Sequence, residues 1–430
     1  MNGPRRRQLL MSLVTVVAVG STVLVAAAKS QVVGAPSEAW VGTWATAMAP
    51  APAAAEGVDP VNTAGFKDQT IRMVVRTSVG GSKGRVRLSN RFGSKPLVVG
   101  HTTMAIPNLA AGAGDLRPET IQEVVFNGQR TVTIPPGGMV ISDAVTLEIP
   151  WTGDVAITIY LPKETGPPTV HVISRTTSYI GTGDHAGAAS GAALPKTIRT
   201  WYFLSGLDTL NRTGAGTIAV VGDSITDGLG STNNTHHRWT NFLASRLVSG
   251  PKGRNAPGIL NLAISGNRLN RDGMDFGAPE LGINASARFA EDVLAQTGVR
   301  AVIVQLGIND IWITQEEPNL IISQLQQLAT LAHQAGLKIF ACTLMPWNGF
   351  VLSDALQYTP ALDSTRLTVN SYLRTTPNFD GILDFDLVLR DPADPSKLRT
   401  DYDFSDHIHP NDAGLEAMAK SIPLEMLLRR

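Results

Sequence analysis

The sequence predicts two regions of different fold class, an all-β sandwich or jelly roll followed by a doubly wound α/β sandwich. From Gly65 to Leu161, short runs of alternating apolar and polar residues follow one another, with Gly- and Pro-rich turns between them. After Thr209, apolar runs are instead spaced far enough apart for helices to cross between parallel strands. A chain of 430 residues is long enough to bury both cores.

The first 28 residues are typical of an export signal. Three arginines at positions 5–7 precede an uncharged apolar run from Leu9 to Ala28, which ends in small residues. The segment Arg6–Leu10 also resembles a twin-arginine signal. The run is long enough to cross a bilayer as an uncleaved anchor. We therefore expect a secreted or periplasmic protein, attached to a membrane only if this segment is retained.

Residues 35–209 are predicted to form the all-β region. A lead-in strand at Trp40–Trp44 precedes a loop rich in Ala and Pro. Alternation then predicts strands at Thr70–Val79, Arg85–Ser89, Leu97–Ile106, Ile121–Phe126, Thr131–Ile134, Val145–Ile149 and Val155–Leu161. We expect Gly181–Ala193 to be a surface loop and Trp201–Leu204 to be a last strand or connector.

Residues 210–430 are predicted to form the α/β domain. The candidate parallel strands are Ile218–Val221, Ile259–Ile264, Ala301–Leu306, Leu337–Leu344 and Gly381–Phe385. The clearest helical stripe consists of Ile321, Leu325, Leu328 and Ala332, and Gly336 ends it.

The composition favours a small neutral partner. The formal net charge is zero and only 17% of residues are charged, so nothing favours nucleic acid. The single cysteine, Cys342, excludes an intrachain disulfide and a thiolate metal cluster. It lies in an apolar run, which predicts a buried structural thiol.

A false catalytic motif occurs in the β region. Gly80-Gly81-Ser82-Lys83-Gly84 matches the G-x-S-x-G elbow letter for letter. It lies between two alternating runs, however, where a strand-to-helix elbow cannot form. We therefore interpret it as a hairpin turn.

Ser224 is the candidate nucleophile. It follows the apolar run Thr217–Val221, at the carboxyl end of a strand, where an open α/β sheet builds its site. A serine attacks only if a base takes its proton, and His409 can act as that base with Asp406 holding its other ring nitrogen. Asp406, His407 and His409 could instead contribute to a metal site, although no other His or Asp cluster completes one.

Two further strand ends carry candidate donors for an oxyanion. Gly266 follows Ile259–Ile264, and its backbone N–H can approach a ligand without a Cβ in the way. Asn309 follows Ala301–Leu306 and offers a side-chain NH₂. Singly, Gly266 could be a turn glycine and Asn309 a helix cap. Their position beside Ser224, just past the ends of strands, favours a shared site.

Together these segments resemble the SGNH or GDSL-type hydrolases. The matching blocks are Gly222-Asp223-Ser224-Ile225-Thr226, Gly266 in Ser-Gly-Asn, Gly307-Ile308-Asn309-Asp310 and Asp406-His407-Ile408-His409-Pro410. The resemblance covers about half of the chain, from Thr217 onward, and implies a flavodoxin-like three-layer α/β/α domain with no cofactor. The N-terminal region is similar to the β-rich extension of a secreted subgroup, judged by Trp40–Trp44 and Arg76–Gly81.

The resemblance implies hydrolysis of carboxylic esters through an acyl-serine. Ser224 would attack the carbonyl as His409 takes its proton, and Asp406 would orient His409. The backbone N–H groups of Ser224 and Gly266, with the Asn309 side chain, would hold the oxyanion.

Few features of the sequence indicate which ester is the substrate. No long amphipathic lid is evident, which favours short acyl groups such as acetyl on a sugar over the longer chains of a lipase or phospholipase. Trp347 and Phe350 are expected either to flank the pocket or to be packed aromatics. The non-enzymatic alternative is a secreted carbohydrate-binding protein with an inert α/β domain. Such a domain should have lost Ser224, Asn309 or His409, and all three are present.

Overall fold

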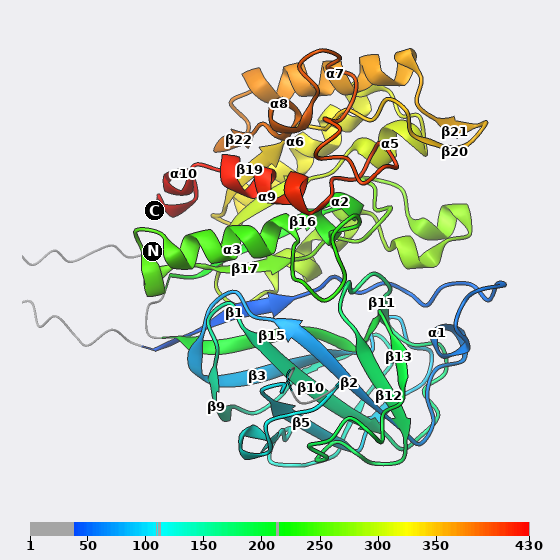
Figure 1. The fold of residues 1–430 in the computed structure, drawn as a ribbon, viewed down its shortest axis with the longest axis vertical. Helices are drawn as coiled ribbons and strands as arrows, with labels where there is room; N and C mark the ends of the chain where they lie inside the picture. Colours follow the sequence, from blue (N-terminus) through cyan, green and yellow to red (C-terminus); the bar gives the residue numbers. More distant parts are fainter. Residues whose placement is uncertain (1–37, 109, 111–112, 212–214, 430) are drawn as a thin grey trace, which may run out of the picture. The chain divides into compact units, whose positions relative to one another are not determined.

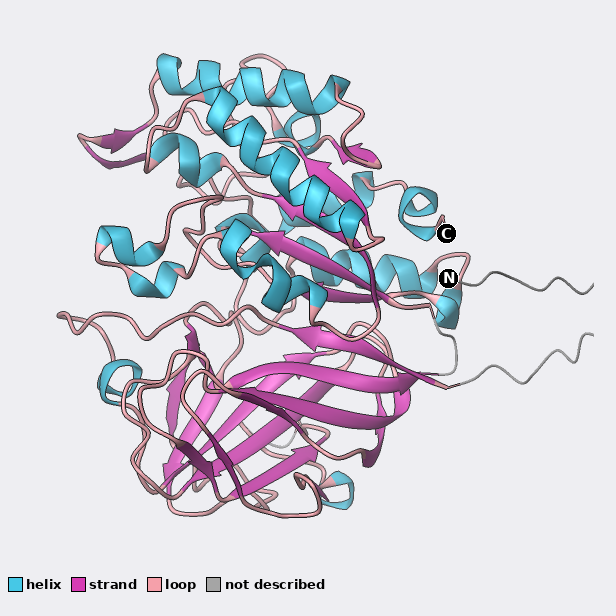
Figure 2. Cartoon of the chain, turned by 180° about the vertical axis from the view of Figure 1, so that it is seen from behind, coloured by secondary structure: helices cyan, strands magenta, loops and turns pink. Residues whose placement is uncertain are grey.

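The computed structural model describes residues 38–108, 110, 113–211 and 215–429, which lie in one compact unit. The predicted export segment, residues 1–28, lies outside them. An antiparallel β-rich region comes first, and an α/β region built on a parallel sheet follows, as the sequence predicts. Figures 1 and 2 show the long helices gathered around the parallel sheet, whereas the antiparallel strands lie together in the β-rich region.

Two main antiparallel sheets form the β-rich region. The first contains β1 (Ala39–Ala45), β15 (Leu204–Asn211), β3 (Gly81–Ser89) and β8 (Met139–Ile141) in this order, with β9 (Val145–Ile149) also paired to β3. The second runs β13 (Lys196–Ile198), β12 (Ser178–Thr182), β2 (Gln69–Arg76), β10 (Asp154–Leu161), β5 (His101–Ala105) and β6 (Gln122–Glu123). Two short strand pairs complete the strands of this region: β11 (Val170–His171) pairs with β14 (Trp201–Tyr202), and β4 (Leu97–Val99) pairs with β7 (Val132–Ile134). The region also contains the short helix α1 (Pro60–Ala64).

Side chains from both main sheets meet in one buried cluster. Ile71 and Met73 of β2 and Val86 and Leu88 of β3 all belong to it. On β9, buried and exposed residues alternate, because successive strand residues point to opposite faces. The β-rich region therefore has its own apolar core.

The α/β region is wound around a five-stranded parallel sheet. Its order is β17 (Gly258–Asn261), β16 (Thr217–Gly222), β18 (Val299–Gln305), β19 (Lys338–Cys342) and β22 (Gly381–Leu383). In chain order these strands read 2-1-3-4-5, which is the flavodoxin-like order. The described residues contain no helix with the length and apolar character of a membrane span.

Helices cover both faces of this sheet. They are α2 (Ser224–Asp227), α3 (Trp239–Ser249), α4 (Ala285–Phe289), α5 (Ile308–Trp312), α6 (Pro318–Gln334), α7 (Pro360–Thr375), α8 (Phe385–Leu389), α9 (Asp412–Ser421) and α10 (Leu424–Leu428). Figure 1 shows α3 and α9 in front of the sheet, and in Figure 2, which views the opposite side, the long helix α6 lies in front of it. The predicted stripe of α6 is entirely buried, and Cys342 is a buried free thiol, as expected.

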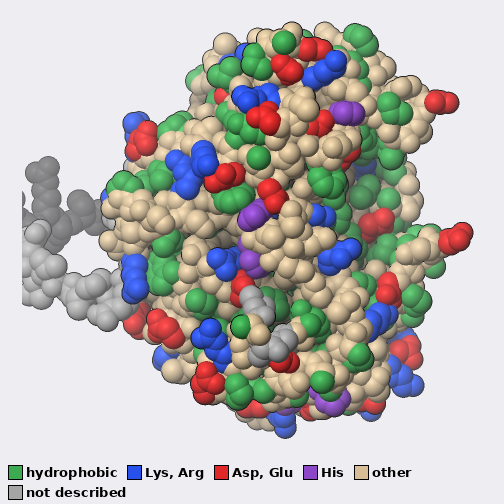
Figure 3. Space-filling model, in the orientation of Figure 1, with side chains coloured by type: hydrophobic (Ala, Val, Ile, Leu, Met, Phe, Trp, Pro, Cys, Tyr) green, Lys and Arg blue, Asp and Glu red, His purple; other side chains and the backbone are tan. Residues whose placement is uncertain are grey.

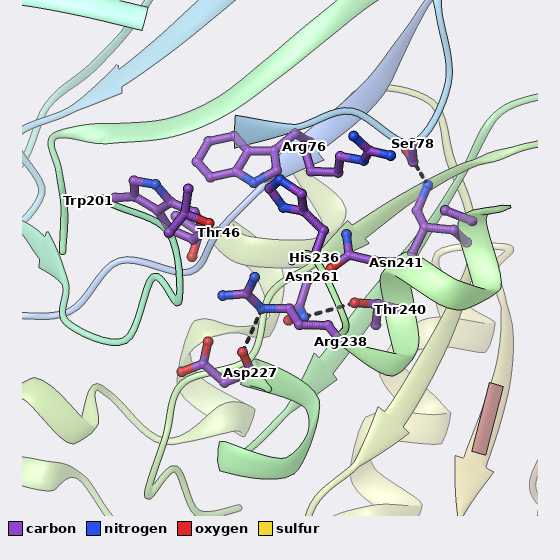
Figure 4. Close-up of a pocket in the computed structure, with 15 residues that line it drawn as sticks. Thr46, Arg76, Ser78, Trp201, Asp227, His236, Arg238, Thr240, Asn241 and Asn261 are labelled. Carbon is purple, nitrogen blue, oxygen red and sulfur yellow. Dashed lines mark hydrogen bonds between the residues drawn. The ribbon is translucent and has the colours of Figure 1, made fainter. Parts of the chain in front are cut away.

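The two regions are joined by close backbone contacts. The Gly42 N–H of β1 lies within hydrogen-bond distance of the Thr297 carbonyl (3.2 Å) and Thr217 Oγ1 (3.1 Å). A Cβ on Gly258 would lie 2.1 Å from the Gly42 oxygen, so no side chain fits at this point of β17. A small cavity of about 30 Å³ lies near this joint. Figure 4 shows residues that line it, among them Arg76 and His236. It has room for ordered water but not for an ester substrate.

Candidate active site

Ser224 begins the one-turn helix α2, directly after β16. Asp223 caps this helix, and its Oδ1 accepts the Ile225 N–H (3.1 Å). Gly222 is required before the turn because a Cβ there would lie 2.5 Å from the Thr226 Cβ. The strand end therefore places the Ser224 hydroxyl at the carboxyl edge of the sheet, where it is 7% exposed.

His409 and Asp406 lie next to Ser224 although they are far from it in the sequence. His409 Nε2 lies 2.8 Å from Ser224 Oγ, and His409 Nδ1 lies 2.6 Å from Asp406 Oδ2. Burial opposes ionisation of Asp406. The hydrogen bonds and charge from His409 and the Ile408 backbone N–H outweigh this effect, so the pKa of the Asp406 carboxyl is lower than usual. A carboxylate, an imidazole and a hydroxyl are thus joined in one chain of hydrogen bonds.

The loop around His409 is held in shape by its own backbone. The Asp406 Oδ1 accepts the N–H groups of Ile408 (3.1 Å) and His409 (2.9 Å), and the Phe404 N–H donates to the His409 carbonyl (2.9 Å). His407 has a positive φ of 67° and points elsewhere, with its Nδ1 2.7 Å from Asp403 Oδ2. Among the residues that the structure describes, no cluster of His, Cys, Asp or Glu has the arrangement of a metal site.

The two predicted oxyanion donors lie on loops that meet each other. Gly266 has a φ of +77° within a turn closed by the Asn267 N–H and the Ile264 carbonyl (3.0 Å). Asn309, near the start of α5, donates from Nδ2 to the Asn267 carbonyl (3.0 Å). Its Oδ1 accepts the indole N–H of Trp312 (3.0 Å), which fixes the orientation of the amide. The second N–H of the Asn309 amide makes no hydrogen bond to a described residue.

Sequence reasoning missed a buried carboxylate that supports this loop. Asp227 lies three residues after Ser224, and its Oδ2 accepts both the Ser265 hydroxyl (2.7 Å) and the Ser265 N–H (3.2 Å). Its Oδ1 lies 2.9 Å from Nε2 of His171, which ends strand β11. The spacing of Asp227 from Ser224 is a possible sequence signal, because residues three positions apart on a helix lie on the same face. No pattern in the sequence points to His171.

Two other carboxyl groups beneath the site favour the protonated form. Burial raises the pKa of Asp223 to about 8. The hydrogen bond from the Ile225 N–H opposes this shift, and the negative charge of Asp310 adds to it. Burial also raises the pKa of Asp310 to about 7, although the Leu269 N–H and the Arg268 charge oppose it. Both carboxyls accept backbone N–H groups next to strand ends, Asp223 from Ile225 and Asp310 from Leu269, so we assign them a structural role.

The remaining candidates from the sequence have different surroundings. Ser82 is exposed on β3, in an antiparallel sheet, and is not on an elbow. Trp347 is fully buried and packs against Tyr358, with 5.3 Å between ring centroids, so it belongs to the core. Phe350 is half-buried and lies 4.9 Å from the ring of Trp312, whose indole holds Asn309.

The order hydroxyl, imidazole, carboxylate at the carboxyl edge of a doubly wound sheet is the arrangement found in serine hydrolases. Residues 220–417 match the GDSL-like Lipase/Acylhydrolase family, and this part of the chain belongs to that family. The α/β region is accordingly that of an ester-hydrolysing enzyme.

Solved structures of similar proteins each align with about half of the chain. An aryl esterase from M. smegmatis is 18% identical, with a TM-score of 0.37, and the alignment covers 48% of this chain and 95% of that one. An acetylxylan esterase from Geobacillus stearothermophilus is 19% identical (TM-score 0.34; 49% and 94% covered). A GDSL-like lipase from Bacteroides thetaiotaomicron is 17% identical (TM-score 0.34; 50% and 88% covered). No curated protein sequence matches the chain.

Proposed function

We propose that this protein is an exported carboxylic ester hydrolase in which Ser224, His409 and Asp406 form the catalytic triad. The observation that carries the proposal is the pair of contacts at His409, 2.8 Å to the Ser224 hydroxyl and 2.6 Å to Asp406. The residues that make these contacts come from two ends of the α/β region, 185 positions apart. The N-terminal export pattern supports the exported location.

The reaction proceeds in two acyl transfers. Ser224 Oγ attacks the ester carbonyl while His409 Nε2 takes its proton, and His409 then gives that proton to the leaving alcohol. A water molecule attacks the acyl-serine by the same route and releases the acid. Asp406, which is ionised at neutral pH because its pKa is low, holds the Nδ1–H of His409 and stabilises the imidazolium.

The oxyanion is held by three donors in this proposal. They are the backbone N–H groups of Ser224 and Gly266 and the free N–H of the Asn309 amide. The hydrogen bond between Asn309 and the Asn267 carbonyl supports this assignment, because it joins the Asn309 side chain to the turn that contains Gly266.

Short-acyl esters of neutral alcohols, such as acetylated carbohydrates, are the proposed substrates. The net charge is zero, and Figure 3 shows acidic and basic side chains interspersed over the viewed face. Such a surface gives no long-range attraction for a highly charged substrate.

One observation favours a second candidate, an acylhydrolase for longer chains. Large apolar side chains are exposed on three segments that connect elements of the α/β region: the short helix after β17, strand β20 (Val351–Ser353) and the loop that carries His409. They are Met274, Phe276, Val351, Leu352 and Phe404. Exposed apolar groups of this kind can contact an acyl chain or a lipid surface.

The test is the Ser224→Ala variant of the protein without its first 28 residues. It should fold like the wild type and lose nearly all turnover of p-nitrophenyl acetate, by about a thousandfold or more. Retained turnover would show that Ser224 is not the nucleophile. Wild-type kcat/KM on p-nitrophenyl esters from acetyl to palmitoyl then separates the two candidates, because only the second predicts a maximum at long chains.

A further inference from the structure

A wide cleft lies on the β-rich region where it meets the loop that follows Gly266. Its volume is about 540 Å³, within the range of about 300–1,000 Å³ typical of small-molecule sites. Its walls come from α1 and the preceding loop, from β13 and from residues 172–177, all in the β-rich region. The α/β region contributes Glu280, in the short helix η4 (Pro279–Leu281).

One side of the cleft is linked to the oxyanion loop. Val172, which lines the cleft, directly follows His171, and His171 contacts Asp227 three residues after the nucleophile. Glu280 precedes Leu281, whose side chain lies 2.6 Å from where a Cβ on Gly266 would be.

The other side of the cleft is linked to His409. Thr177, another lining residue, exchanges two hydrogen bonds with the Asn234 side chain, of 2.8 and 3.0 Å. The loop that contains Asn234 also contains Gly230, where a Cβ would lie 3.4 Å from the His409 Cβ. The residues that line the cleft therefore contact or adjoin segments that pack against the proposed base and the proposed oxyanion donor.

Polar groups with spare hydrogen-bonding capacity line the cleft. The Glu280 Oε2 is buried and has no hydrogen-bond partner in the described part of the chain. Arg199 is exposed and forms no ion pair with any described residue. The Asn62 Oδ1 accepts the Tyr202 hydroxyl (2.6 Å), which leaves its NH₂ for another acceptor. A buried carboxylate oxygen without a partner is costly, and a ligand hydroxyl would satisfy it.

We propose that this cleft is a subsite for the sugar part of the ester, the alcohol that leaves when Ser224 is acylated. The inference rests on the proposed function above. Planar carboxylate, guanidinium and amide groups can each bond two neighbouring hydroxyls, which suits a neutral polyhydroxylated ligand. The charge of Glu280 opposes an anionic headgroup. The β-rich region thus selects the alcohol, while the α/β region performs the reaction.

The test compares two substrates of the same acyl group in the full exported chain. Glu280→Ala and Arg199→Ala should each lower kcat/KM on acetylated xylo-oligosaccharides by about tenfold, mainly through KM, because each removes a hydrogen bond from a charged group. Turnover of p-nitrophenyl acetate, which has no sugar, should stay within about twofold of the wild type. Glu148→Ala, an exposed glutamate on β9 outside the cleft, is the matched control and should change neither.

Three results would overturn the subsite. The variants could leave hydrolysis of the oligosaccharide unchanged, or they could lower turnover of both substrates equally, which would indicate a displaced oxyanion loop. Phosphatidylcholine vesicles could also prove the better substrate and be the one affected. Each of these results is compatible with an active serine. Failure of the proposed function would appear separately, as p-nitrophenyl acetate turnover that survives Ser224→Ala.

Discussion

His171 Nε2 of the β-rich region lies 2.9 Å from Asp227 Oδ1 of the α/β region, and both side chains are almost fully buried. The His171 Nδ1 lies 3.0 Å from the Ala47 carbonyl, so both ring nitrogens face acceptors. The pair thus joins His171 to the carboxylate that holds Ser265, the residue before the proposed oxyanion donor Gly266.

Replacing His171 by Phe should therefore affect both stability and catalysis. The change leaves Asp227 buried without its partner, which should lower the free energy of unfolding by about 3 kcal/mol. It should also lower kcat on p-nitrophenyl acetate at a temperature where the variant is folded, because Ser265 loses a firmly held acceptor. Urea unfolding and steady-state kinetics measure the two effects.

The matched control for this prediction is His101→Phe. His101 is also a buried histidine of the β-rich region, between the carboxylates of Asp184 (2.9 Å) and Glu123 (3.0 Å), and its hydrogen-bond partners among the described residues all lie in that region. It should cost stability and leave kcat close to the wild-type value. Equal kcat values for the two variants would contradict a role of His171 in positioning the site.

Asp406→Asn should lower kcat by on the order of a thousandfold or more. An amide cannot fix the His409 tautomer or stabilise its cationic form as a carboxylate does. The same loop provides the comparison, because Asp403 holds His407 Nδ1 at 2.7 Å in a similar arrangement that does not reach Ser224. We expect Asp403→Asn to retain most of the wild-type kcat, and a similar loss in both variants would count against Asp406 as the triad acid.

Gly266→Ala should lower kcat much more than Gly277→Ala. Both glycines have a φ near +70°, so each alanine pays a backbone cost of about 1 kcal/mol. At Gly266 the new Cβ would also lie 2.6 Å from Leu281, whereas nothing lies within 4 Å at Gly277. The displaced turn should cost about tenfold or more in kcat. Kinetics on p-nitrophenyl acetate would refute this if the two variants were equally active.

Asp310→Asn should stabilise the protein at high pH. The folded pKa of Asp310, about 7, lies above its ordinary value of 3.8, so the folded state prefers the protonated carboxyl. Below pH 3.8 the carboxyl is protonated in both the folded and the unfolded state, so the raised pKa does not lower the free energy of unfolding. The loss of stability grows as pH rises from 3.8 to about 7. The gain from the uncharged amide should therefore increase from pH 4.5 to pH 8, reaching about 2 kcal/mol or more. Urea unfolding at both pH values tests this, and parallel pH dependences would contradict it.

The sequence predicted the parallel strands well because each is a continuous apolar run between breaks. The predicted strand Ile218–Val221 corresponds to β16 (Thr217–Gly222), and Leu97–Ile106 was divided only by Gly100 into β4 and β5. β8 was missed because it is short, and β12 because it runs into the Gly- and Ala-rich segment that was predicted as a loop from Gly181. Short strands carry too few residues for alternation to be seen.

In the site, too, residues in local motifs could be predicted from the sequence, whereas residues paired over long range could not. Ser224 and Asn309 could be named because each sits in a motif just past a strand, and parallel strands bring such ends together. His409 could be named from its Asp-x-x-His motif, although α8 and a long loop separate it from the last strand, β22. His171 and Trp347 could not be placed in this way. The partner of His171 is 56 positions away in a region of different fold. Trp347 packs against Phe350 and Tyr358, which flank the hairpin of β20 (Val351–Ser353) and β21 (Leu356–Gln357). Long-range pairing of side chains leaves no local pattern.

The absence of a side chain at Gly42 and Gly258 bears on any attempt to isolate the catalytic half. These positions let β1 lie directly against β17, and Ser78 Oγ accepts the Ile259 N–H at 2.9 Å. A fragment starting at residue 215 would expose those backbone groups and leave Asp227 without His171. Expression of such a fragment, or its fusion to a foreign partner, should therefore yield an enzyme whose oxyanion loop is exposed to solvent and more mobile.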